Sequence, residues 1–150
     1  MSFETLAILF VVVIAIHNAE EAWLLPDWSA GAGKWHVPVG AFEFHFALCV
    51  LTFAAALGAA AAIIGGRGGI GAYLVSGCAL AMLINVLVPH LAATIALRTY
   101  APGTATALVL NLPVTSALML KAIGDGYVAP NTFAWAGPAV TLAVALSIPV

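Results

Sequence analysis

Five long apolar stretches, separated by short breaks rich in glycine, proline and polar residues, occupy most of this 150-residue chain. About 20 apolar residues are enough for an α-helix to cross the hydrocarbon core of a bilayer. Inside lipid the backbone must satisfy its own hydrogen bonds, which a helix does within one segment. We therefore predict an all-α fold, a polytopic membrane helix bundle of about five transmembrane helices forming a single domain over residues 1–150. The predicted helices cover about residues 3–25, 39–64, 70–97, 104–123 and 132–150.

The composition supports a lipid environment and excludes several classes of function. Hydrophobic residues make up 64% of the chain and charged residues only 7%, whereas soluble domains carry about 25% charged residues. The formal net charge is −2, so the chain has no excess of basic residues with which to neutralise nucleic-acid phosphates. We expect an integral, multi-pass membrane protein, located in a bacterial inner membrane, that does not bind nucleic acid.

Several polar side chains lie well inside the apolar stretches, where they are costly. A charged residue at the centre of a membrane helix costs about 2.5–3.5 kcal/mol, so such residues usually pair with one another or carry function. At ~1.5 Å of rise per residue, those of the first four stretches fall in one layer, roughly 6–12 Å below the same membrane surface. The residues of this layer are Glu20, Glu21, Glu43, His45, His90 and Asn111, and His17 also lies well inside the first stretch.

The first predicted helix carries the densest group of these residues. His17, Glu20 and Glu21 are spaced i, i+3 and i+4, which places all three on one helical face. One metal ion could take two of them as ligands, and Glu and His at such spacing hold the metals of helical di-iron proteins. The alternative is a buried charge network that locks the helices together.

The second helix offers His45 and Glu43, which point to different sides of a regular helix. We expect His45 to point inward, either as a further metal ligand or as a hydrogen-bonded packing residue. Glu43 is expected nearer the lipid headgroups, where it could still contact the site or its substrate.

The third and fourth helices each contribute an asparagine, and the third also contributes His90. Asn85 and His90 are five residues apart and would not share a face of an ideal helix, but Pro89 frees a backbone carbonyl and is expected to bring them together. Asn85 and Asn111 fit either interhelical hydrogen bonding or the support of a metal ligand.

Three motifs resemble one known family. They are His17-Asn18-Ala19-Glu20-Glu21, Asn85 followed closely by His90, and Tyr100-Ala101-Pro102-Gly103. Together they resemble the HXXEE-motif family of small integral membrane proteins, whose third motif is Tyr-x-Pro-Gly and whose Asn and His are separated by three residues rather than the four found here. The resemblance implies metal binding by the His and Glu motifs. The Tyr-x-Pro-Gly segment is itself a turn signal, and Tyr100 is placed to cover the site.

We therefore predict a metal-dependent intramembrane enzyme. His17, His90 and one of Glu20 or Glu21 would hold a divalent ion, with His45 as a possible further ligand. Imidazole and carboxylate ligands suit zinc, iron or manganese. The remaining glutamate would act as general base toward a water that the ion acidifies. Hydrolysis of a lipid-like or apolar substrate, entering from the bilayer, is the favoured reaction.

Three other functions remain open from the sequence. Intramembrane Glu and His residues also form proton or metal-ion pathways. A metal-free acid and base pair could instead act on a lipid or isoprenoid. A non-enzymatic membrane partner is the third. The small-residue stretch 54–62 also permits self-association into a homo-oligomer.

Overall fold

The computed structural model describes residues 1–31 and 38–147, and over these residues the chain forms helices and turns without a strand. Segment η3 is a π-helical turn inserted in a longer helix, whereas segment η2 contains a kink at Val88, whose backbone is not helical. The elements in order are α1 (Phe3–Gly31), α2 (Ala41–Gly65), α3 (Ile70–Asn85), η2 (Val86–Leu91), α4 (Ala92–Leu97), α5 (Thr104–Thr106), η3 (Ala107–Asn111), α6 (Leu112–Gly124) and α7 (Pro130–Ser147).

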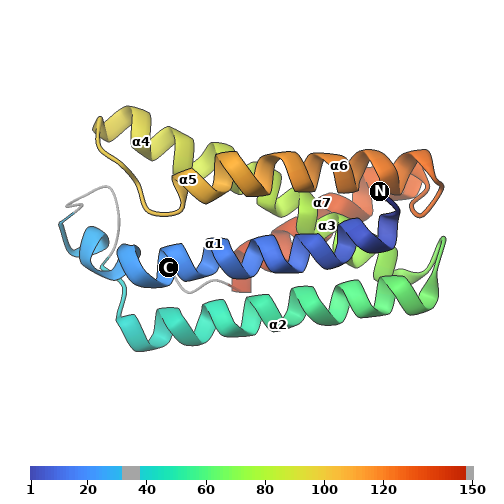
Figure 1. Cartoon of the computed structure of the whole chain (residues 1–150), viewed down its shortest axis with the longest axis horizontal. Coiled ribbons are helices and arrows are strands. Elements are labelled where there is room, and N and C mark those ends of the chain that lie inside the picture. Colours follow the sequence, from blue (N-terminus) through green and yellow to red (C-terminus); the bar gives the residue numbers. More distant parts are fainter. Residues whose placement is uncertain (32–37, 148–150) are drawn as a thin grey trace.

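The predicted all-α membrane bundle is confirmed. Four helical spans of the described residues are long and apolar enough to cross a membrane, namely Phe3–Gly31, Ala41–Gly65, Ile70–Leu97 and Thr104–Gly124. They run side by side (Figure 1). The last helix, α7, corresponds to the fifth predicted helix and packs against α3. The predicted end of this last helix at residue 150 lies outside the described residues.

The first helix continues beyond the proline at which we predicted its end, and reaches Gly31. Pro26 has no backbone N–H, so the carbonyl of Ala22, one turn earlier, loses its helical donor. His45 of α2 supplies a replacement, because its Nε2 lies 2.8 Å from the Ala22 oxygen. Ser29 adds a hydroxyl that donates to the Pro26 carbonyl at 2.9 Å. The helix therefore continues past Pro26 with one hydrogen bond from α2 and one from within its own last turns.

The third and fourth spans both depart from regular helix next to a proline. Val88, just before Pro89, has φ −136° and ψ 117° inside η2, so the third span is kinked next to this proline. In the fourth span, η3 directly precedes Pro113 at the start of α6. A proline removes one helical donor, and π-turns accommodate such defects, frequently at functional sites.

Small residues hold α2 and α3 close together. A Cβ added at Gly71 would lie 2.3 Å from both Ala61 C and Ala62 N, so the two backbones are nearly in contact there. Ala55 and Ala59 of the same α2 face are also buried. The small-residue stretch identified in the sequence thus packs within the chain, as close-packed membrane helices do.

An aromatic contact closes the end of the bundle where the N-terminus lies (Figure 1). Phe3 stacks on Tyr127 with 3.8 Å between ring centroids, and the Tyr127 hydroxyl donates to Glu4. Arg67, in the glycine-rich turn after α2, lies 5.3 Å from the centroid of the same ring. These contacts join three chain segments at the end opposite the polar residues described next.

Candidate metal centre

Three potential metal ligands converge from two helical segments. On α1, His17 and Glu21 are one turn apart, and their Nε2 and Oε1 atoms lie 3.8 Å from each other. From η2, the Nε2 of His90 lies 3.3 Å from the same Glu21 oxygen. One ligand atom from each of the three residues lies within 4.8 Å of the other two.

The donor set and its spacing suit a small divalent ion. At bond lengths of about 2.0–2.2 Å, two ligands of a tetrahedral zinc lie roughly 3.3–3.5 Å apart. The His90–Glu21 spacing of 3.3 Å already matches, and the His17–Glu21 spacing of 3.8 Å is somewhat wider. His17 and His90 are only 1% and 3% exposed, and their rings pack edge to face with centroids 4.9 Å apart. The group is therefore screened from solvent by the protein.

The kink in η2 brings Asn85 to this group. Its Nδ2 lies 2.9 Å from His90 Nε2 and 3.5 Å from His17 Nε2. The non-helical backbone at Val88 redirects the chain between Asn85 and His90, and the expected approach of the two residues beside Pro89 is confirmed. Asn85 contacts both histidines at the atoms that would face an ion.

The two adjacent glutamates have different partners. Glu20 turns away from the histidines and accepts hydrogen bonds from four donors in the segment 100–106. The Tyr100 hydroxyl and the Gly103 N–H, the latter at 3.1 Å, donate to Oε1. The Thr106 N–H and hydroxyl donate to Oε2 at 3.2 and 2.6 Å. With its oxygens so occupied, Glu20 is not placed to serve as the general base that we expected of one of the pair.

The Tyr-Ala-Pro-Gly segment is the expected turn, and it also contacts the site. Gly103 has φ +86°, a conformation that glycine adopts without strain. Tyr100, rather than covering the three ligands, binds Glu20. Burial and the hydrogen bond to the Glu20 carboxylate raise the pKa of the Tyr100 hydroxyl.

Three further residues proposed from the sequence do not join the ligand group. His45 is exposed and its Nε2 contacts the Ala22 carbonyl, which corrects its expected role as a further ligand. Glu43 is exposed on α2, in keeping with its expected place near the headgroups. Asn111 is fully buried, and both polar atoms of its side chain lack a hydrogen-bond partner among the described residues.

Thr106 is a site residue that the sequence analysis missed. Its hydroxyl lies 2.8 Å from His17 Nδ1 as well as 2.6 Å from Glu20. The available signal was its position three residues after Gly103, in the first turn of a helix that begins at the depth of the polar layer. A lone threonine in an apolar helix carries little information by itself.

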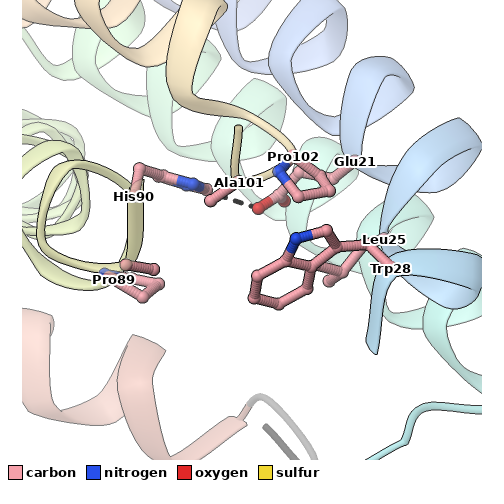
Figure 2. Close-up of a pocket in the computed structure, with 8 residues that line it drawn as sticks. Glu21, Leu25, Trp28, Pro89, His90, Ala101 and Pro102 are labelled. Atoms are coloured by element: carbon pink, nitrogen blue, oxygen red, sulfur yellow. Dashed lines mark ion pairs between the residues drawn. The ribbon is translucent and has the colours of Figure 1, made fainter. Parts of the chain in front are cut away.

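A small cavity adjoins the ligand group (Figure 2). It measures about 50 Å³, enough for a few waters. Glu21 and His90 face each other across its inner end, and the indole of Trp28 lies across the space from Pro89. The other lining residues are Leu25, Ala93, Ala101 and Pro102. The cavity thus offers an apolar wall leading to a carboxylate and an imidazole.

Comparison with known proteins identifies the family. Residues 8–118 match the family described as "Protein of unknown function with HXXEE motif". The chain belongs to this family. The chain is also similar to the "Uncharacterized protein YrkK" of Bacillus subtilis (strain 168), with 41% identity over 112 residues, which make up 75% of this chain and 71% of the relative. No solved structure matches the chain.

The HXXEE motif of this chain is His17 to Glu21, and the fold gives its residues separate surroundings. His17 and Glu21 lie with His90 in the ligand group. Glu20 instead joins α1 to the Tyr-x-Pro-Gly turn. All three motifs of the family resemblance therefore meet at one end of the bundle.

Proposed function

We propose that this protein is a membrane-embedded, metal-dependent enzyme of hydrolase type. The observation that carries the proposal is the convergence of His17, Glu21 and His90 beside a small cavity. Neutral imidazoles and a carboxylate suit zinc, iron and manganese alike. A bound divalent ion would supply Lewis acidity and acidify a water molecule.

Glu21 is the proposed proton acceptor as well as a ligand. Its Oε1 faces both histidines, and it lines the cavity, where a water would be held. Glu20 is engaged by four donors and is assigned a positioning role. The buried histidines would keep bulk water away from the reacting atoms, which strengthens electrostatic interactions at the site.

The proposed substrate is lipid-like, with an apolar chain and a small hydrolysable polar group. The support is the lining of the cavity, which is mostly apolar and also includes the Glu21 carboxylate and the His90 imidazole. The site also lies between spans that are long and apolar enough to cross a membrane. A bacterial inner membrane is the proposed location, and the relative from Bacillus subtilis supports a bacterial source.

Metal content of the detergent-purified protein tests the proposal. Elemental mass spectrometry should find close to one zinc, iron or manganese per chain after reconstitution. His17→Ala and His90→Ala should lose that ion while keeping their helical circular dichroism and monodisperse elution. His45→Ala is the matched control, because His45 also lies in a membrane helix but contacts Ala22 instead of the ligand group. A parent protein that stays metal-free after reconstitution with all three ions would overturn the proposal.

The substrate is tested separately from the metal. Ala93 is half-buried in the cavity wall, and Ala93→Phe would fill most of the space beside Glu21. The variant should keep its metal but lose hydrolysis of long-chain acyl esters supplied in mixed micelles. Equal turnover by the parent and by Ala93→Phe would rule out this cavity as the substrate site.

A proton or metal-ion pathway is the second candidate, favoured by one observation. Ser76 and Asn111 are fully buried, and their side chains have atoms without hydrogen-bond partners among the described residues. Buried polar groups of this kind commonly bind internal water, through which protons can pass. Proton flux into liposomes that falls in Glu21→Gln would support this function over hydrolysis.

A further inference from the structure

Thr106 lies between a carboxylate and a histidine. Its hydroxyl oxygen is 2.6 Å from Glu20 Oε2, 2.8 Å from His17 Nδ1 and 3.2 Å from the Gly103 carbonyl oxygen. A threonine hydroxyl has one proton to donate and two lone pairs with which to accept. The hydroxyl can therefore donate its hydrogen toward only one of these three neighbours at a time.

The partners decide where that hydrogen goes. A carboxylate and a carbonyl oxygen can only accept, whereas a neutral imidazole nitrogen either donates or accepts. The Glu20 contact is the shortest of the three, and hydrogen bonds to ionised acceptors are shorter and about twice as strong as neutral ones. The hydroxyl proton accordingly points to Glu20, and toward His17 the hydroxyl oxygen accepts.

His17 must then carry its proton on Nδ1. A neutral imidazole protonated at Nδ1 has its lone pair on Nε2, and Nε2 is the atom that faces Glu21 and the Asn85 amide nitrogen. That amide nitrogen is itself a donor, so a lone pair on Nε2 also suits this neighbour. The Thr106 and Asn85 contacts thus favour the same tautomer, and the Glu21 oxygen, 3.8 Å from Nε2, is too distant for the hydrogen bond that would favour the other one.

We propose that Glu20 and Thr106 are positioning residues that hold His17 in the Nδ1–H tautomer, with its Nε2 lone pair directed into the ligand group. The consequence for ion binding rests on the metal site proposed above. Metal-bound histidines usually donate their second ring N–H to a carboxylate, carbonyl or water. Here the Thr106 hydroxyl accepts that hydrogen bond and links it to the Glu20 carboxylate, and the Gly103 backbone is a second hydrogen-bond partner of His17.

The tautomer can be measured without any metal. Protein labelled with ¹⁵N-histidine, treated with chelator and held at pH 8, gives two-bond ¹H–¹⁵N correlation patterns that distinguish Nδ1–H from Nε2–H rings, with His17 assigned from His17→Gln. The parent should have His17 protonated at Nδ1. Thr106→Val, which keeps the shape of the side chain but removes the hydroxyl, should move His17 toward Nε2–H, and Thr106→Ser should restore the parent pattern.

Metal affinity gives the second readout. Thr106→Val should bind zinc about 10–100-fold more weakly, the usual cost of removing an outer partner of a ligating histidine, and Thr106→Ser should recover most of the affinity. Thr94→Val is the matched control, because Thr94 binds Thr104 and the Ala101 N–H in the same turn without contacting His17. It should change neither the tautomer nor the affinity.

The outcomes separate this inference from the proposed function. An Nε2–H pattern in the parent, or an unchanged pattern in folded Thr106→Val, overturns the role of Thr106. If Thr106→Val does not fold, Glu20→Leu, which removes the acceptor of the Thr106 hydroxyl hydrogen, tests the same chain of hydrogen bonds, and an unchanged His17 pattern there has the same meaning. An Nδ1–H parent that responds to Thr106→Val but binds no metal supports the hydrogen-bond role and overturns the metal site alone.

Discussion

Gly103 lies directly against His90: a Cβ built on Gly103 would be 2.5 Å from His90 Cε1. The same Cβ would also lie 2.9 Å from His17 Cε1, so one missing side chain leaves room for both histidine rings. The glycine of the Tyr-x-Pro-Gly turn is therefore required by its neighbours as well as by its positive φ.

Gly103→Ala should weaken metal binding by displacing both rings. The expected loss is at least about tenfold in zinc affinity, similar to that of disturbing an outer partner of a ligand. Gly126→Ala is the matched control, because Gly126 also has positive φ but open space around its Cβ position. Both variants carry similar backbone strain, so equal zinc affinities measured by competition with a chelating dye would contradict the prediction.

His45→Phe should lower stability without releasing metal. The substitution removes the hydrogen bond to Ala22 O and leaves this carbonyl, already deprived of a donor by Pro26, without a replacement. The expected cost is about 0.5–1.5 kcal/mol, measured by thermal unfolding in detergent. Loss of the bound ion in a folded His45→Phe protein would restore His45 as a ligand.

Tyr100 should titrate above the usual tyrosine range. Burial and the Glu20 carboxylate both favour the protonated phenol and raise its pKa, and Glu20→Gln should lower that pKa toward its ordinary value. Because the unfolded chain has an ordinary tyrosine pKa near 10, this contact stabilises the fold fully below about pH 10. Its contribution is lost as the pH rises through the higher folded pKa. Ultraviolet titration in a Tyr73→Phe, Tyr127→Phe background isolates Tyr100, and an unchanged titration in Glu20→Gln would refute the coupling.

Gly71→Ala should destabilise the bundle by separating α2 from α3. The added methyl would stand 2.3 Å from the backbone of Ala61 and Ala62, and overpacking of this kind costs about 1–3 kcal/mol. Gly65→Ala, with nothing within 4 Å of its Cβ position, should be neutral or stabilising. The comparison needs only the two thermal unfolding midpoints, and equal midpoints would mean that the helices can move apart at no cost.

The sequence predicts the helices well because lipid leaves the backbone few alternatives. The predicted end of the first helix is wrong, and the reason lies outside the local sequence. Pro26 is a sound local signal for a helix end, but the donor that replaces its missing hydrogen bond comes from His45, on another helix. Local rules do not include such a partner.

The site was predictable where helical spacing decides it. One turn of α1 separates His17 from Glu21, and the depth of His90 matches theirs, so the three could be grouped from the sequence. The different roles of Glu20 and Glu21 could not be predicted, because in the sequence these adjacent residues differ only in their direction around the helix. The fold decides their roles, because the donors of the turn at 100–106 reach Glu20.

The long sequence separation within this network has a consequence for biogenesis. Glu20 precedes its Thr106 partner by 86 residues, so the first helix reaches the insertion machinery well before the groups that satisfy its carboxylates have been synthesised. An isolated charged residue is costly in the hydrocarbon core. It follows that the first span should insert poorly when synthesis stops after the second helix, and that its stable integration should depend on translation continuing through the fourth.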